Sequence, residues 1–89
     1  MTIGRIIINT LREEMQNSSG SHWTRNTKVT SAVVYVRIRQ NGGTMEDAMA
    51  GKNQTKLIME TAATSVRGTE KRFRYSIMLA LSAMDEVTA

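Results

Sequence analysis

Apolar residues recur at helical spacing through most of the chain, and short polar runs separate the segments in which they do. The apolar residues of segment 2–16 are spaced so that they line one face of a helix, and only Ile8 falls outside that face. Thr2, at the start of the segment, is a suitable N-cap. A strand through Ile6–Ile8 is the alternative, because β-branched residues favour strands. The polar run at 17–24 then predicts a loop. The apolar positions of the helix are Ile3, Ile6, Ile7, Leu11 and Met15.

The segment from about residue 28 to 40 fits two structures. As a helix, it carries apolar residues on one face and ends at Asn41–Gly42 in a left-handed conformation. As a strand, it alternates inward Val and Ile with outward Tyr and Arg. The β-branched residues favour the strand, whereas the length and the flanking caps favour the helix, which is the preferred prediction. The apolar face of that helix is Val29, Ala32, Val33 and Val36.

The pattern of residues 44–64 predicts two short helices joined by a turn at Gly51. A glycine suits the turn because it tolerates the positive φ that reverses a chain. Thr44 and Asp47 resemble a capping box for the first helix, and Asn53 is a suitable N-cap for the second. This arrangement is typical of a helix-turn-helix-like unit, in which the second helix lays its N-terminal residues against base edges in the major groove. The alternative is that Gly51 only joins two helices of a bundle.

A last helix is predicted after Gly68, opening at Thr69. Its middle, SIMLALSAM at residues 76–84, is apolar on nearly every side. A helix of that kind lies either at the centre of a bundle or in a subunit interface. The residues at helical spacing are Phe73, Ile77, Ala80, Leu81 and Met84.

The expected fold is therefore mainly α, a small helical bundle of four to five helices in a single domain, residues 1–89. The alternative is an α+β fold with one strand at about 28–40. A chain of 89 residues without cysteine has no disulfide to stabilise it. We therefore expect a homo-oligomer, a dimer or larger, since self-association adds apolar burial that one copy lacks.

Few residues could carry chemistry, and no enzyme activity, metal or cofactor is expected. The single histidine, His22, lies in the predicted loop, and the acidic pairs are adjacent in sequence, so they point in different directions on a helix. The chain shows neither a signal peptide nor an apolar run of membrane-spanning length. A cytoplasmic protein without membrane contact is expected.

Basic charge is unevenly distributed. The net charge is +4, and no Asp or Glu occurs between Met15 and Met45. Clustering of this kind predicts contact with phosphates, and double-stranded DNA is the expected partner. Asn and Gln pair with adenine, and Lys reaches guanine or phosphate. A ribbon-helix-helix dimer, with Tyr35 on an outward strand, is a second layout. The candidate nucleic-acid-binding residues are Lys52, Asn53, Gln54, Thr55, Lys56, Arg25, Lys28, Arg37, Arg39 and Arg72.

Three functions fit these features. The first is a small basic DNA-binding regulatory protein that acts as an oligomer. The second is a non-enzymatic inhibitor or interaction protein, of the compact kind found in mobile elements, that binds another protein. The third is an oligomeric protein that sequesters an anionic small ligand such as a nucleotide. DNA binding would weaken steeply with salt, because phosphate contacts release counterions.

Overall fold

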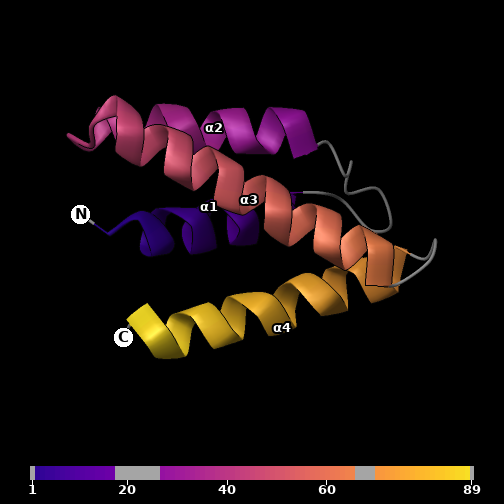
Figure 1. Cartoon of the computed structure of the whole chain (residues 1–89). Coiled ribbons are helices and arrows are strands. Elements are labelled where there is room, and N and C mark those ends of the chain that lie inside the picture. Colours follow the sequence, from indigo (N-terminus) through magenta and orange to yellow (C-terminus); the bar gives the residue numbers. More distant parts are fainter. Residues whose placement is uncertain (1, 18–26, 66–69, 89) are drawn as a thin grey trace.

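The computed structural model describes residues 2–17, 27–65 and 70–88, with their side chains at 2–16, 27–62 and 75–84. These ranges form four helices, α1 (Ile3–Asn17), α2 (Thr27–Gln40), α3 (Met45–Ser65) and α4 (Glu70–Thr88) (Figure 1). The predicted helical bundle is confirmed. The strand considered for residues 28–40 is wrong, because those residues belong to α2.

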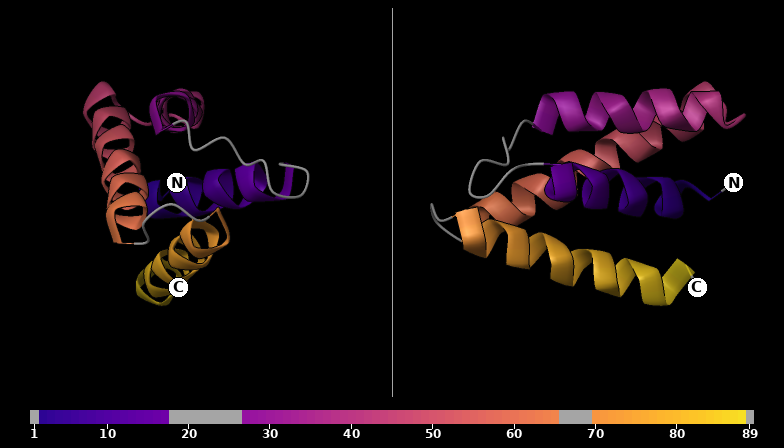
Figure 2. Two further views of the ribbon diagram at one scale, coloured as in Figure 1. Left: turned by 90° about the vertical axis from the view of Figure 1, so that its right-hand side faces the viewer. Right: turned by 180° about the vertical axis from the view of Figure 1, so that it is seen from behind.

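The helices are arranged around α1, which lies between α2 and α4 (Figures 1 and 2). Helix α3 runs across the other three and packs most extensively against α2. No contact joins α2 to α4 among the described residues. These two helices therefore lie on opposite sides of the bundle, and each presents a second face away from it.

The core is formed by apolar side chains from all four helices. Ile8 is fully buried, although the sequence pattern placed it off the apolar stripe of its helix. The reason is the central place of α1, which packs against three neighbours and therefore buries a wider face than an outer helix does. Burial of each large side chain contributes about 1.5–3 kcal/mol. The core residues are Ile7, Ile8, Leu11, Val34, Ile38, Ala48, Met59, Ala62, Ile77 and Leu81.

A tight link joins α2 to α3, as the sequence predicts. Gly42 has a φ of 90°, the left-handed conformation that glycine adopts without strain. The amide of Gly43 donates to the carbonyl of Ile38 at 2.9 Å, and that of Gly42 donates to the carbonyl of Arg39 at 3.1 Å. This pair of bonds is a Schellman motif, which satisfies the last carbonyls of a helix.

The start of α3 is a reciprocal capping box between Thr44 and Asp47, and this prediction is confirmed. The amide of Asp47 donates to the Thr44 hydroxyl at 3.1 Å, while the amide of Thr44 donates to the Asp47 carboxylate at 3.0 Å. Two amides that a helix leaves without internal partners are thereby satisfied. The link and the box together hold α3 antiparallel to α2.

The predicted turn at Gly51 is wrong, because α3 continues through it without a break. Gly51 instead marks a close approach of helices. A β-carbon at this position would lie 2.2 Å from the Cδ1 atom of Ile38 and 3.3 Å from side-chain atoms of Ile3 and Val34. The glycine lets α3 pack tightly on α1 and α2. The helix-turn-helix-like unit predicted for residues 44–64 is therefore absent.

Candidate functional site

The polar run of α3 was the strongest functional signal in the sequence, and the structure distributes it around the helix. Asn53 and Gln54 are exposed, whereas Lys52 and Lys56 are half-buried. Thr55 is fully buried, and its hydroxyl donates to the carbonyl of Gly51 at 2.8 Å. The side chain of Thr55 therefore faces the core, and this position offers no exposed group for the predicted contact with DNA.

The place of this run along α3 also differs from the predicted one. Successive residues of a helix turn by about 100°, so neighbours such as Asn53 and Gln54 point in different directions. A recognition helix overcomes this by presenting its N-terminal end to the groove. In this protein the first turn of α3 begins at Met45, and residues 52–56 lie in the middle of the helix. The run therefore lacks the end-on presentation that the predicted contacts require.

The basic residues of α2 divide into two groups. Arg37 turns towards α1, where its guanidinium donates to the Thr10 hydroxyl at 3.1 Å and forms an ion pair with Glu13. Lys28 and Arg39 are exposed, and Arg39 donates to the carbonyl of Gly43 at 3.3 Å. Arg25 and the side chain of Arg72, which were also predicted to bind DNA, lie outside the described residues.

Helix α2 carries apolar residues on both of its faces. Its inner face buries the hydroxyl residues Thr30 and Ser31 beside Val34 and Ile38. Its outer face exposes 54% of Val29 and 49% of Val36. We call the residues of this face the outer stripe of α2. Its members are Val29, Ala32, Val33 and Val36.

One edge of the outer stripe is basic. Lys28 lies four positions before Ala32, and Arg39 lies three positions after Val36, and residues so spaced are neighbours on a helix. No acidic residue occurs in α2 to offset them. The outer stripe therefore combines exposed valines with one basic edge, while Glu13 of α1 forms an ion pair with Arg37 of the same helix.

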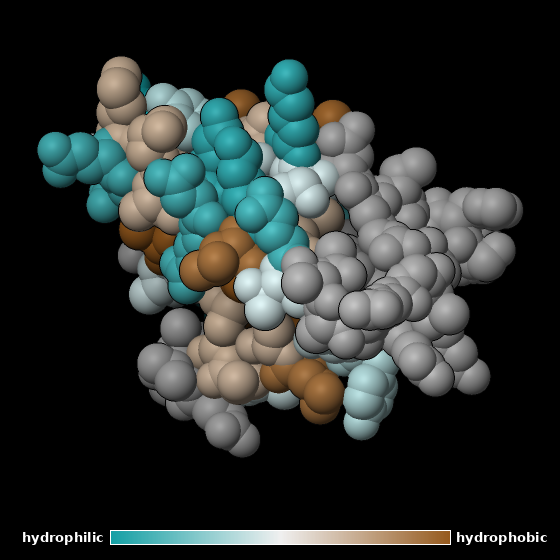
Figure 3. Space-filling view, turned by 45° about the vertical axis from the view of Figure 1, so that its right-hand side comes forward, coloured by the Kyte–Doolittle hydropathy of each residue, from teal (hydrophilic) through white to brown (hydrophobic). Residues whose placement is uncertain are grey.

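A second apolar surface lies on the opposite side of the molecule. Ile77 and Leu81 of α4 are buried, while 64% of Tyr75, 56% of Met78 and 55% of Leu79 are exposed. We call these three exposed residues the outer face of α4. In Figure 3 the most hydrophilic residues gather in the upper part of the view, whereas the lower part, where α4 lies, is mainly tan and brown.

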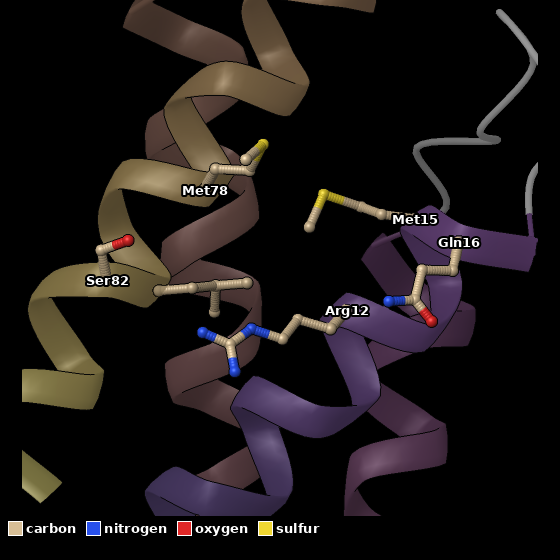
Figure 4. Close-up of a pocket in the computed structure, with 6 residues that line it drawn as sticks. Arg12, Met15, Gln16, Met78 and Ser82 are labelled. Atoms are coloured by element: carbon tan, nitrogen blue, oxygen red, sulfur yellow. The ribbon is translucent and has the colours of Figure 1, made fainter. Parts of the chain in front are cut away.

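Two hollows flank α4. A cleft of about 350 Å³ separates it from α1, and there Met15 and Met78 face one another while Arg12, Gln16 and Ser82 line the wall (Figure 4). A smaller hollow of about 200 Å³ lies between α4 and α3. The residues of this second hollow include Leu57, Ile58, Ala62 and Ala80.

The described part of the chain contains no cluster of three or more His, Cys, Asp or Glu that could hold a metal ion. None of its helices is long and apolar enough to cross a membrane. No protein-family model matches the chain, and neither a curated protein nor a solved structure is significantly similar to it.

Sequence reasoning identified the residues of the outer stripe of α2 but could not tell which way they face. The sequence also shows that the middle of the last helix is apolar on nearly every side. That second signal predicted either a central helix or an interface. Because α4 contacts only α1 and α3 among the described residues, its place in the fold excludes the central position.

Proposed function

We propose that the chain is a non-enzymatic interaction protein that binds another protein through the outer stripe of α2. The observation that carries this proposal is the second apolar face of the helix, which exposes Val29 and Val36 while Val34 and Ile38 fill the core. The fold needs only the inner face, so it does not account for the outer one. Exposed apolar residues in a contiguous patch mark a surface that another molecule covers.

The spacing of the stripe supports a helical partner. Residues 29, 32, 33 and 36 follow the i, i+3, i+4, i+7 pattern by which one helix is recognised along its length. Complete burial of an exposed valine side chain contributes on the order of 1.5 kcal/mol, and about half of Val29 and of Val36 remains to be covered, so the stripe supplies part of a micromolar affinity. Valine also has few rotamers to lose when a partner covers it.

The charge beside the stripe supports an acidic partner. Lys28 and Arg39 would face acidic side chains of a partner helix, and complementary charge increases the rate of association and selects against basic competitors. A second copy of this chain would instead bring Lys28 and Arg39 against like charges. We therefore propose a different protein, with an amphipathic helix whose apolar face is bordered by Asp or Glu, as the partner.

DNA binding is the second candidate function, and the exposed amides of Asn53 and Gln54 beside two lysines support it. These groups pair with base edges or phosphate oxygens. Without the helix-turn-helix-like unit, such binding would rest on charge and would fall steeply with salt. Sequestration of an anionic small ligand is the third, and Arg12 in the cleft between α1 and α4 would supply its positive charge.

The test is a titration followed by NMR of labelled valine methyl groups. The probe is a designed helical peptide with leucine on one face and glutamate along both edges. We expect the methyl signals of Val29, Val33 and Val36 to shift saturably, and Val36→Asp to abolish the effect while Asn53→Asp preserves it. Unshifted valine signals, or binding that survives Val36→Asp, would contradict the proposal.

The same sample distinguishes the DNA hypothesis. Titration with a mixed-sequence duplex should leave the valine methyl groups unchanged if the outer stripe binds protein. Shifts confined to the amides of Asn53 and Gln54, with affinity that falls by orders of magnitude as salt is added, would favour DNA binding instead.

A further inference from the structure

We infer that the outer face of α4 is the contact between two copies of this chain, which associate with their α4 helices antiparallel. The inference does not depend on the outer stripe of α2, which lies on the other side of the bundle. It rests on the shape of the surface around α4 and on the order of charges along that helix.

The shape of this surface is self-complementary. Tyr75 and Leu79 protrude from α4, while Met78 lines a hollow of about 350 Å³ on one side of the helix and a hollow of about 200 Å³ lies on the other. A twofold interface uses one patch twice, so the patch must carry both the protrusions and the hollows that receive them. The protruding residues of each copy fill the hollows beside α4 of the other, as ridges fill grooves when helices pack.

The apolar surface around α4 extends beyond that helix. The apolar lining continues from Met15 of α1, across α4, to Leu57 of α3, so the contact is not confined to one helix. Stable interfaces cover roughly 800 Å² on each partner, with a polar rim around an apolar centre. Arg12, at the outer wall of the larger cleft, takes a place in such a rim.

The order of charges along α4 selects a second copy as the occupant. By sequence, the helix is mainly basic near its start, at Lys71, Arg72 and Arg74, and acidic near its end, at Asp85 and Glu86. Residues 75–84 between them contain no charge. Antiparallel pairing brings the basic end of one helix level with the acidic end of the other.

The register follows from the centre of the exposed face. With Leu79 at the twofold axis, Arg72 lies seven positions before the axis and Glu86 seven positions after it. Arg72 of each copy is therefore level with Glu86 of the other. Within one chain these residues are about 21 Å apart along the helix, too far to pair. A parallel arrangement would align like charges instead.

The first experiment measures mass by sedimentation over a wide range of protein concentration. We expect the wild-type chain at twice its mass of 9.9 kDa, Leu79→Asp at 9.9 kDa with an unchanged circular dichroism spectrum, and Val36→Asp still dimeric. If Leu79→Asp does not fold, Tyr75→Lys takes its place. A wild-type monomer at every concentration, or a folded Leu79→Asp dimer, would overturn the inference.

A charge-reversal series tests the antiparallel arrangement. Glu86→Arg should raise the dissociation constant of the dimer about a hundredfold, because twofold symmetry removes two pairs and each contributes about tenfold at the low end for close charge pairs. Adding Arg72→Glu should restore it, because the two ends then attract with their signs exchanged. Adding Arg39→Glu instead is the control, since it restores the net charge without restoring the pair. A double variant no tighter than Glu86→Arg would refute the register.

The result is separable from the proposed function. Leu79→Asp monomers should bind the acidic peptide through α2 as the wild-type chain does. Loss of dimerisation with peptide binding retained supports both surfaces. Peptide binding that fails in a protein that still dimerises through α4 refutes only the proposed function.

Discussion

The two outer helices, α2 and α4, both expose apolar residues, but the charges that accompany them differ. Beside the outer stripe of α2, the charged residues Lys28 and Arg39 have one sign. Along α4, both signs occur at opposite ends of an uncharged centre. Charge of a single sign can be matched only by a different molecule, whereas charge that reverses along a helix is matched by the same helix turned around. We therefore propose two kinds of partner for these two surfaces.

The inner faces of the two helices differ as well. The inner face of α4 is anchored by Ile77 and Leu81, which are among the largest buried side chains. The inner face of α2 contains Thr30 and Ser31, and its position depends on the close contact with Gly51. Hydrophobic burial orients both helices, through Ile77 and Leu81 in α4 and through Val34 and Ile38 in α2, and the close approach of α2 to Gly51 adds a second constraint.

The largest expected effect separates the inner face of α4 from its outer face. Leu81→Asp places an unpaired charge in the core, which should reduce the free energy of unfolding by more than about 3 kcal/mol and prevent stable folding. Leu79→Asp, two positions away and exposed, should change the stability of the monomer by less than about 0.5 kcal/mol. Urea denaturation followed by circular dichroism provides the measurement. A well-folded Leu81→Asp protein would show that the core is assigned incorrectly.

A smaller effect tests what holds α2 in place. Gly51→Leu would force side-chain atoms into Ile38, Ile3 and Val34, and should reduce the free energy of unfolding by about 1–3 kcal/mol. Ala50→Leu is the matched control, because residue 50 is exposed on the same helix. Equal stability of the two variants would mean that α2 and α3 do not approach closely at Gly51. The packing that directs the outer stripe of α2 away from the core would then be assigned incorrectly.

The start of α3 gives the next effect in size. Asp47→Ala removes one half of the capping box, which should cost about 1 kcal/mol in thermal or chemical denaturation. Glu46→Ala, at the neighbouring exposed position, removes a charge from the same turn without touching the box. If the two substitutions were equally harmful, the dipole of the helix rather than the box would be responsible.

The smallest effect concerns the charge beside α2. Glu13→Gln releases Arg37 from its ion pair, and because both groups are partly exposed the stability should change by less than about 1 kcal/mol. The released cation adds positive charge near the outer stripe, so an acidic peptide should bind more tightly. Glu14→Gln is the matched control. Weaker peptide binding by the Glu13 variant would contradict the attraction of the stripe for acidic partners.

The sequence was sufficient for much of the local structure. The left-handed Gly42 and the Thr44–Asp47 capping box were predicted correctly, because each depends on residues within one or two turns of chain. The helix preferred for residues 28–40 is also confirmed, as α2 (Thr27–Gln40), although β-branched residues favour strands. Tertiary packing on α3 outweighs that preference.

The orientation of α2 and the role of Gly51 could not be predicted. A helix that carries apolar residues on both faces has no single stripe to direct it inward, so the periodicity of Val29 to Val36 leaves its direction open. A glycine within a helical pattern signals either a turn or a close approach of backbones. Only the three-dimensional packing, with Ile38 against Gly51, distinguishes the two.

The most direct test of the two-surface account uses the absence of cysteine from the chain. Two single-cysteine proteins, Leu79→Cys and Val36→Cys, are oxidised under identical conditions and their covalent dimers are quantified. We expect rapid formation of a disulfide-linked dimer through residue 79, which lies near the twofold axis. We expect little disulfide-linked dimer through residue 36. Efficient cross-linking through residue 36 with none through residue 79 would contradict it, since two copies would then meet across α2 instead of α4.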